Sequence, residues 1–396
     1  MRAVLGTVLA VACLASPAGE AGKQPEKRDP QRWLALFNGK NLEGWQVVGG
    51  EWKVEEGVIG GAGSEEGKTA HLVSDATFDN FILHARFRSE GGTGWLGFRG
   101  DLKKDSFNGL RLGVGPGKES GFGSVDGGVP SQSPAKLEAQ LPPDAWIDCE
   151  IVCAGERIRA SFNGIPLMDF IASGSANGRL ALMASPGGNG PLLWKDIRVL
   201  PLYPDQDFRP LFEGNDLNNG WFQIGEERWS ARNGVITGET AKGGYGWLVT
   251  DREYQDFILN FRYRWTSGNS GVQFRSWLVG GEEMHGLQAD IDPSIPQMTG
   301  MLYDEHERAT LAKSPPKVDE SYDKELWHNY EISAIGEDIR LYHDGLLTVH
   351  FTETDPKRIA KGLIALQVHS APKDQGVKVE WKDLRILNLE PPSPWE

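Results

Sequence analysis

The chain has 396 residues, which is more than one typical domain needs and enough for two. Its 50 glycines and 14 tryptophans suit many short strands joined by tight turns better than long helices. A formal net charge of −14 argues against a nucleic-acid partner, because no excess of lysine and arginine is present to neutralise phosphates.

The N-terminus is typical of an export signal followed by a tether. Arg2 gives a basic start, and residues 3–12 form an apolar run too short to span a bilayer. We expect a signal peptide over residues 1–21, a flexible tether over 22–31, and no transmembrane span. The stretch LAVAC weakly resembles a lipoprotein cleavage box, which makes Cys13 an alternative lipid anchor. The protein is therefore expected in the periplasm or outside the cell.

The rest of the chain repeats itself once. LFNGKNLEGW (36–45) is matched by LFEGNDLNNGW (211–221), and WKDIRVL (194–200) is matched by WKDLRIL (381–387). Further matched segments lie between them in the same order, so an internal duplication is indicated. We expect a first domain over residues 32–203 and a second over 204–396.

Both repeats are predicted to be β-structure. FILHARFR (81–88) and FILNFRYR (257–264) alternate in polarity, which is typical of half-buried strands. Asn163-Gly164 and Asp344-Gly345 favour two-residue hairpin turns. Neither repeat contains a convincing long amphipathic helix. The predicted fold class is all-β, with two tandem jelly-roll β-sandwiches.

The second repeat contains the segments GNSGVQFRS, GLQAD, TGMLYDE, LWHNYEI and VEWKDLRIL in this order. With these segments it resembles the 3-keto-disaccharide hydrolase domain family, and the first repeat resembles the family more loosely. The resemblance implies a concanavalin A-like sandwich and export. It also implies cleavage of glycosides whose sugar has been oxidised to a 3-ketone.

Comparison of the two repeats separates scaffold from candidate site. Framework positions such as Trp194 and Trp381 agree. Six polar residues of the second repeat differ from their counterparts: Asn269, Gln273, Gln288, Asp290, Gln367 and His369 replace Thr93, Gly97, Arg111, Gly113, Met183 and Ser185. A solvated rim would exchange one polar side chain for another. Three of the counterparts, Gly97, Gly113 and Met183, instead carry no polar side chain. This joint loss predicts a binding or catalytic wall on one face of the second sandwich.

The resemblance sets the chemistry expected of this wall. A 3-keto group acidifies the C2 hydrogen, so a base, an oxyanion stabiliser and an acid for the leaving group are needed. His369 is best placed as base near neutral pH, while Asp290 or Glu305 would serve if burial raised its pKa. Arg275 would stabilise the oxyanion, but it is matched by Arg99, so a structural ion pair is an equal alternative.

The remaining candidates would bind substrate. Asn269, Gln273, Gln288, Tyr303 and Gln367 are expected to hold hydroxyl groups, and Trp247 to stack on a sugar ring. A divalent cation at Asp290 and Asp292 is a further option with few ligands, and no other cofactor is indicated.

The main alternative is a non-catalytic carbohydrate-binding or cell-surface interaction protein. The two functions are distinguished by whether the polar set converges in space or lies spread over a flat face. The oligomeric state is left open.

Overall fold

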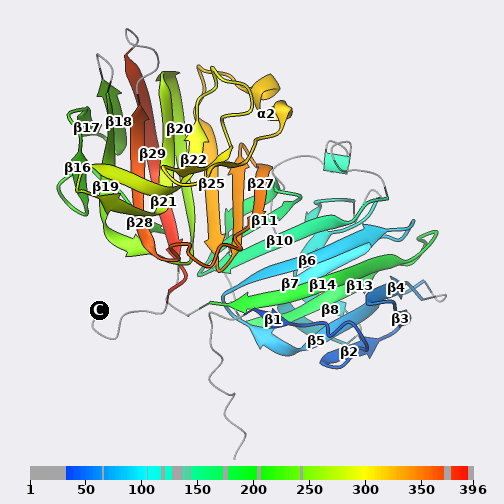
Figure 1. Ribbon diagram of the computed structural model, residues 1–396. Helices are drawn as coiled ribbons and strands as arrows, with labels where there is room; N and C mark the ends of the chain where they lie inside the picture. The colour runs from blue at the N-terminus through cyan, green and yellow to red at the C-terminus, as the bar shows by residue number, and fades with distance from the viewer. Residues whose placement is uncertain are drawn as a thin grey trace, which may run out of the picture.

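The computed structural model describes residues 33–390, apart from 65–66, 105, 117–120, 127–136, 139–140, 142–143, 173–176, 203–206, 241–243 and 370–375. The expected signal peptide, tether and Cys13 lie outside the described residues, as does the expected boundary after Tyr203. Two β-sandwiches make up the described chain, one from each repeat (Figure 1).

The first sandwich pairs an eight-stranded sheet with a six-stranded sheet. The eight-stranded sheet runs β3 (Glu51–Glu55), β4 (Val58–Ala62), β14 (Leu192–Pro201), β6 (Phe81–Ser89), β10 (Ile147–Ala154), β11 (Arg157–Phe162) and β12 (Ile165–Ile171), with β1 (Leu34–Ala35) on β14. The six-stranded sheet runs β2 (Trp45–Val48), β5 (Ala70–Phe78), β13 (Gly178–Ala184), β7 (Gly94–Lys103), β8 (Ser106–Gly113) and β9 (Val125–Asp126).

The second sandwich repeats this order with an eight-stranded and a seven-stranded sheet. The eight-stranded sheet runs β17 (Arg228–Arg232), β18 (Val235–Thr240), β29 (Val377–Asn388), β20 (Phe257–Ser267), β25 (His328–Ile335), β26 (Asp338–His343) and β27 (Leu346–Thr352), with β15 (Arg209–Pro210) on β29. The seven-stranded sheet runs β16 (Trp221–Ile224), β19 (Tyr245–Tyr254), β28 (Gly362–His369), β21 (Asn269–Val279), β22 (Glu283–Ile291), β23 (Leu302–Glu305) and β24 (Ala309–Ala312).

The predicted all-β tandem sandwich is confirmed. Each sandwich buries its own core between its two sheets, with Trp194 and Trp381 at matched positions and fully buried. The predicted hairpin turns are present, because Asn163 and Asp344 both have φ of 47°, as such turns require. Helix is scarce: α2 (Pro316–Ser321) has six residues. Among the described residues, no helix has the length and apolar character needed to cross a membrane.

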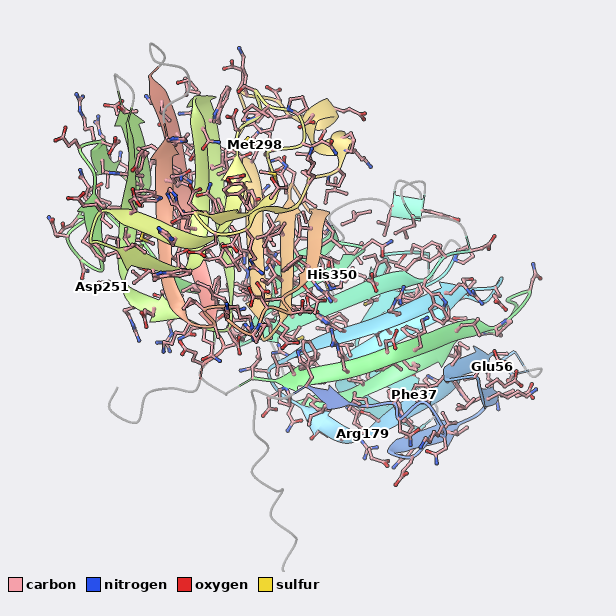
Figure 2. All side chains as sticks on the ribbon, viewed as in Figure 1. Phe37, Glu56, Arg179, Asp251, Met298 and His350 are labelled. Carbon is pink, nitrogen blue, oxygen red and sulfur yellow. The ribbon has the colours of Figure 1, made fainter. Side chains whose placement is uncertain are left out.

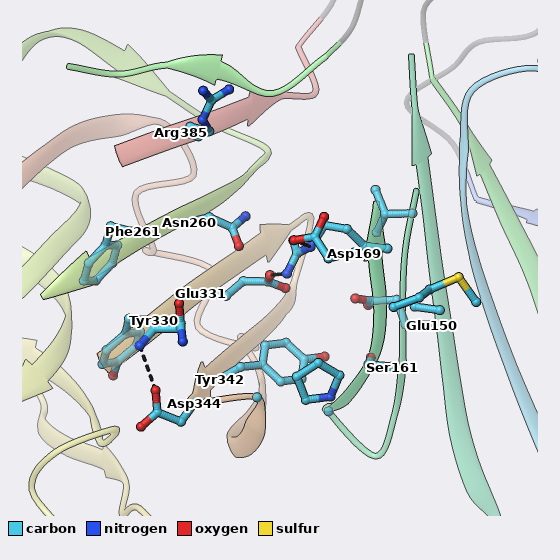
Figure 3. Close-up of a pocket in the computed structure, with 18 of the residues that line it drawn as sticks. Glu150, Ser161, Asp169, Asn260, Phe261, Tyr330, Glu331, Tyr342, Asp344 and Arg385 are labelled. Carbon is cyan, nitrogen blue, oxygen red and sulfur yellow. Dashed lines mark hydrogen bonds and ion pairs between the residues drawn. The ribbon is translucent and has the colours of Figure 1, made fainter. Parts of the chain in front are cut away.

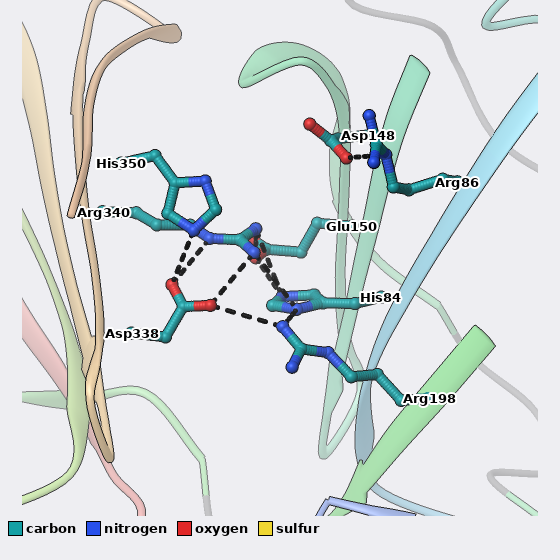
Figure 4. Close-up of polar contacts among 8 residues, drawn as sticks. All are labelled: His84, Arg86, Asp148, Glu150, Arg198, Asp338, Arg340 and His350. Atoms are coloured by element: carbon teal, nitrogen blue, oxygen red, sulfur yellow. Dashed lines mark hydrogen bonds and ion pairs between the residues drawn. The ribbon is translucent and has the colours of Figure 1, made fainter. Parts of the chain in front are cut away.

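The two sandwiches pack through the outer faces of their eight-stranded sheets, and the packing is nearly two-fold symmetric. Arg159 pairs with Glu331, while Arg340, the counterpart of Arg159, lies 3.4 Å from Glu150, the counterpart of Glu331. His350 lies close to this junction in Figure 2, and Figure 4 shows it beside the polar network on one side. The apolar part of the junction also uses matched positions from the two repeats: Ile82 and Ile258, Ala154 and Ile335, Leu200 and Leu387, and Leu202 and Leu389.

The symmetry is broken by a cavity on one side of the junction. This cavity of about 500 Å³ is lined by both sandwiches, including Asn260, Arg385 and Asp169 (Figure 3). On the other side, the Trp33 ring packs at a tilt against His84, with the ring centroids 4.5 Å apart, and lies 4.6 Å from the guanidinium of Arg198. The outer faces of the six- and seven-stranded sheets take no part in the apolar junction.

Candidate functional site

The outer face of the seven-stranded sheet gathers most of the predicted site residues. Gln367 on β28 pairs with Gly271 on β21, and Gly271 pairs with Asp290 on β22. In the next row, Gln273 pairs with Gln288. We call Gln273, Gln288, Asp290 and Gln367 the polar wall. Their alternation with core residues on the same strands places all four on one face, as the sequence parity predicts.

The polar wall is buried and incompletely hydrogen-bonded. Its four side chains are at most 3% exposed. Gln288 donates from Nε2 to Asp290 Oδ1 at 2.5 Å. Five other buried atoms of the wall have no protein partner among the described residues: both amide atoms of Gln273, Oε1 of Gln288 and of Gln367, and Oδ2 of Asp290. One such atom costs about 1–3 kcal/mol, so five on adjacent side chains call for hydrogen-bond partners from bound water or from a polar ligand.

Burial also sets the charge of the wall. It raises the pKa of Asp290 well above its ordinary range, and the charges of Glu305 and Asp292 raise it further, against the hydrogen bond from Gln288. Asp290 therefore holds its proton to a higher pH than an exposed carboxyl group does.

The same face of the first sandwich has different side chains at the matched positions. The register places Trp95 where the second sandwich has Gly271, and Met183 where it has Gln367. Trp95 and Met183 pack with Phe107, and the Arg111 guanidinium lies 5.3 Å from the Trp95 ring. These side chains line a cavity of about 780 Å³ whose chemistry differs from that of the polar wall. The register thus supports the pairing of positions made from the sequence.

A rim of more exposed residues adjoins the wall. His369 pairs across the sheet with Asn269 and with Tyr245, whose ring lies 5.8 Å from the imidazole. Partial burial lowers the pKa of His369, and the charge of His306 lowers it further. Burial raises the pKa of Glu305, which is half-buried. Tyr303 pairs with Gln288 at the sheet edge, so it also lies beside the wall.

The β21–β22 hairpin covers part of this face. A register shift between Phe274 and Trp277 marks a β-bulge, which bends the hairpin. Leu278 and Met284 then pack against Trp247. The loop after β22, where Figure 2 labels Met298, reaches Asn269, whose Nδ2 lies 3.8 Å from the Met298 sulfur.

Two predicted roles are wrong. The Arg275 guanidinium is buried and donates to the carbonyls of Gln255 and Gly336, both at 2.8 Å, and to Asp256 Oδ1 at 3.0 Å. These bonds hold the bulge in place, so Arg275 is structural rather than an oxyanion stabiliser. Trp247 is 1% exposed beneath the hairpin and offers no ring face to a sugar.

The contacts of Asp292 do not favour the expected cation site at Asp290 and Asp292, which stays a prediction. Asp292 Oδ1 accepts bonds from the backbone and hydroxyl of Ser294 and shapes the turn after β22. In the described part of the chain, neither aspartate belongs to a group of three metal-ligating side chains. Sequence reasoning overlooked Tyr245, whose OH lies 3.3 Å from Glu283 and links the rim to the hairpin.

Fold and site together define a tandem β-sandwich protein whose two sandwiches carry different side chains on the matched sheet face. The chain belongs to the family described as the 3-keto-alpha-glucoside-1,2-lyase-like domain, which matches residues 32–200 and 207–387. Membership of this family supports a carbohydrate-related function.

Solved structures with a similar fold each match about one sandwich. A putative glycosyl hydrolase from Parabacteroides distasonis is 17% identical, with 46% of this chain and 98% of that chain covered and a TM-score of 0.36. A carbohydrate-binding module from Bacillus subtilis is 15% identical, with 43% and 96% covered and a TM-score of 0.34. No curated protein matches the chain.

Proposed function

We propose that the second sandwich binds an oxidised glycoside at the polar wall and cleaves it by elimination across C1 and C2. The observation that carries this proposal is the set of five buried, unpartnered polar atoms on adjacent side chains of the wall. Sugar hydroxyl groups both donate and accept hydrogen bonds, so they match amide and carboxyl groups of this kind. The family supplies the reaction class.

The reaction needs one proton removed and one delivered. His369 would accept the C2 proton of the 3-keto sugar, and the electron pair of that C–H bond would form the C1=C2 double bond. The C1–O bond then breaks with its electrons on the leaving oxygen, which takes a proton. Addition of water across C1=C2 completes the net hydrolysis.

The pKa shifts suit these roles. The lowered pKa of His369 keeps the imidazole neutral and able to accept a proton near pH 7. The raised pKa of Asp290 favours the protonated carboxyl group, which is the form that can donate. His369 and Asp290 lie on β28 and β22, on either side of β21, so the proposed base and acid flank one strand of the same sheet.

The test is release of the aglycone from a 3-keto glycoside and from the same glycoside unoxidised. The full chain should cleave only the 3-keto form. His369→Gln and Asp290→Asn should each lower kcat/KM by about 10²–10⁴-fold. Ser185→Ala, at the first-sandwich counterpart of His369, is the matched control and should leave the rate unchanged.

The alternative function predicts a different outcome. A carbohydrate-binding protein without catalysis would bind the glycoside in a calorimeter and release no aglycone from either form. We also propose export, on the basis of residues 1–21. Recovery of the protein from the cytoplasmic fraction of its native cells, with the N-terminus uncleaved, would contradict it.

A further inference from the structure

We infer that Glu283, His285 and His306 form a binding site for one divalent transition-metal ion at the rim of the polar wall. Each side chain offers one ligand atom, and the three atoms lie within 4.8 Å of one another. Glu283 and His285 come from the start of β22, and His306 follows β23. Binding of the ion is independent of the proposed function, whereas its role in catalysis rests on that function.

A carboxylate already orients one of the two imidazoles. Glu307 Oε1 lies 2.9 Å from Nδ1 of His285, which turns Nε2 of that ring toward Glu283 Oε2 at 3.8 Å. A carboxylate that fixes one ring nitrogen while the other faces a ligand position is the usual outer arrangement of a metal-bound histidine.

The second imidazole is held beside the first. The rings of His285 and His306 stack at 4.8 Å, and Glu305 Oε1 lies 3.5 Å from Nε2 of His306. His306 has φ of 60°, a conformation that costs a non-glycine residue energy and that clusters at functional sites.

The internal duplication supports a functional reading of these residues. The register of β8 against β7 places Ser106 and Asn108 at the positions of Glu283 and His285. Between them, Phe107 and Met284 both remain apolar and buried. The packing position is thus kept in both sandwiches, while the two ligand positions lose their carboxylate and imidazole together with the polar wall.

The donor set selects the class of metal. Two imidazoles and one carboxylate suit zinc, manganese, iron or cobalt, and leave coordination positions open. Calcium and magnesium prefer sites built entirely from oxygen atoms. Tyr245 contacts both Glu283 and His369, so the ion would lie at the rim where the sugar is expected. In the proposed reaction it would act as a Lewis acid on the C3 ketone oxygen.

A second group, His328, His343 and Asp344, has the residue types of a metal site but carries no such inference. Both nitrogens of His328 are engaged, with Asp344 Oδ2 at 2.6 Å and the Asp323 carbonyl at 2.8 Å. His343 Nε2 lies 2.8 Å from the Tyr263 hydroxyl. This group is already satisfied within the protein.

The test is metal binding by the untagged full chain after removal of metals with a chelator. Titration calorimetry with Zn²⁺ and with Mn²⁺ should show one ion bound per chain, and millimolar Mg²⁺ should not compete. His285→Ala and His306→Ala should abolish binding, and Glu307→Gln should weaken it about 10–100-fold. Asp344→Asn in the second group and His350→Ala at the junction are the controls and should bind as the unaltered chain does.

The inference is overturned if no ion binds, if binding survives in the His285→Ala/His306→Ala double variant, or if Asp344→Asn abolishes it. The two proposals also fail separately. If one metal ion binds per chain but no 3-keto glycoside is turned over, the proposed function is contradicted and the metal site is supported. If the chain keeps full turnover after a chelator has removed its metals, the catalytic role of the ion is contradicted and the proposed function is supported.

Discussion

Arg99 and Arg275 donate to three groups at matched positions in the two sandwiches. Arg99 donates to the carbonyls of Asp79 and Gly155 and to the Asn80 side chain. Arg275 donates to the matched groups of Gln255, Gly336 and Asp256. Both arginines have positive φ, 49° and 47°, within a bulged strand. The two sandwiches share this contact although their outer sheet faces differ, so the contact belongs to the scaffold.

Arg275→Ala should therefore destabilise the protein without a specific effect on catalysis. Removal of one partner of a buried ion pair leaves Asp256 uncompensated and typically costs about 3–5 kcal/mol. Denaturant unfolding measures the loss, and kcat of the folded fraction should stay near that of the unaltered chain. Arg99→Ala is the matched variant. A stable Arg275→Ala protein with no turnover would restore a catalytic role.

The acid limb of the pH dependence of kcat/KM should report the proposed base, His369. His369 accepts a proton only when neutral, so activity should fall as the pH drops through its pKa, which lies below the ordinary value of 6.5. The acid limb should disappear from the residual activity of His369→Gln. An unchanged acid limb in that variant would assign it to another group.

Asp290→Asn should make the protein more stable at pH 8, although it should lower the activity. A carboxyl group whose pKa is raised on folding stabilises the native state below its unfolded pKa, and this contribution is lost as the pH rises through the folded pKa. Asparagine does not ionise. Thermal unfolding should thus show the variant more stable than the unaltered chain at pH 8, with the difference shrinking toward pH 4. A variant less stable at pH 8 would mean that the ionised carboxylate is held by partners.

Arg340→Ala should loosen the junction between the sandwiches. The guanidinium contacts Glu150 of the first sandwich and Asp338 of the second, and is mostly shielded from solvent. Its loss leaves both carboxylates without this cation, so calorimetry should show two separated unfolding transitions in place of one. Arg228→Ala, which removes an exposed ion pair far from the junction, should leave the unfolding profile unchanged. A single unshifted transition in Arg340→Ala would show that the apolar contacts suffice.

Strand parity alone predicts the polar wall, because alternation along β21, β22 and β28 fixes which side chains share a face. Strand parity predicts the wrong orientation for Arg275, because a β-bulge follows Phe274 and shifts the register there. The residue types in this segment do not reveal the bulge. Parity also fails for the accessibility of Trp247. That property depends on where the bent hairpin places Met284, which is a contact between segments far apart in the chain.

The junction was equally hidden from the sequence. Charged residues such as Arg159, Glu331 and Arg340 alternate with core residues, and this pattern is also typical of a solvated sheet face. Only the register and packing show that these charges meet across the junction. The missed rim residue Glu283 had a usable signal, because its counterpart Ser106 lacks a carboxylate.

The reciprocal ion pairs at the junction have a consequence for assembly. Each sandwich presents the same self-complementary patch, which is the property that lets identical subunits form closed two-fold dimers. Within this chain, one repeat takes the place of the second subunit. The two sandwiches of one chain therefore pack as the two subunits of such a dimer would. Both copies of the patch are buried in this contact. A higher-order assembly of intact chains must be built from a different surface.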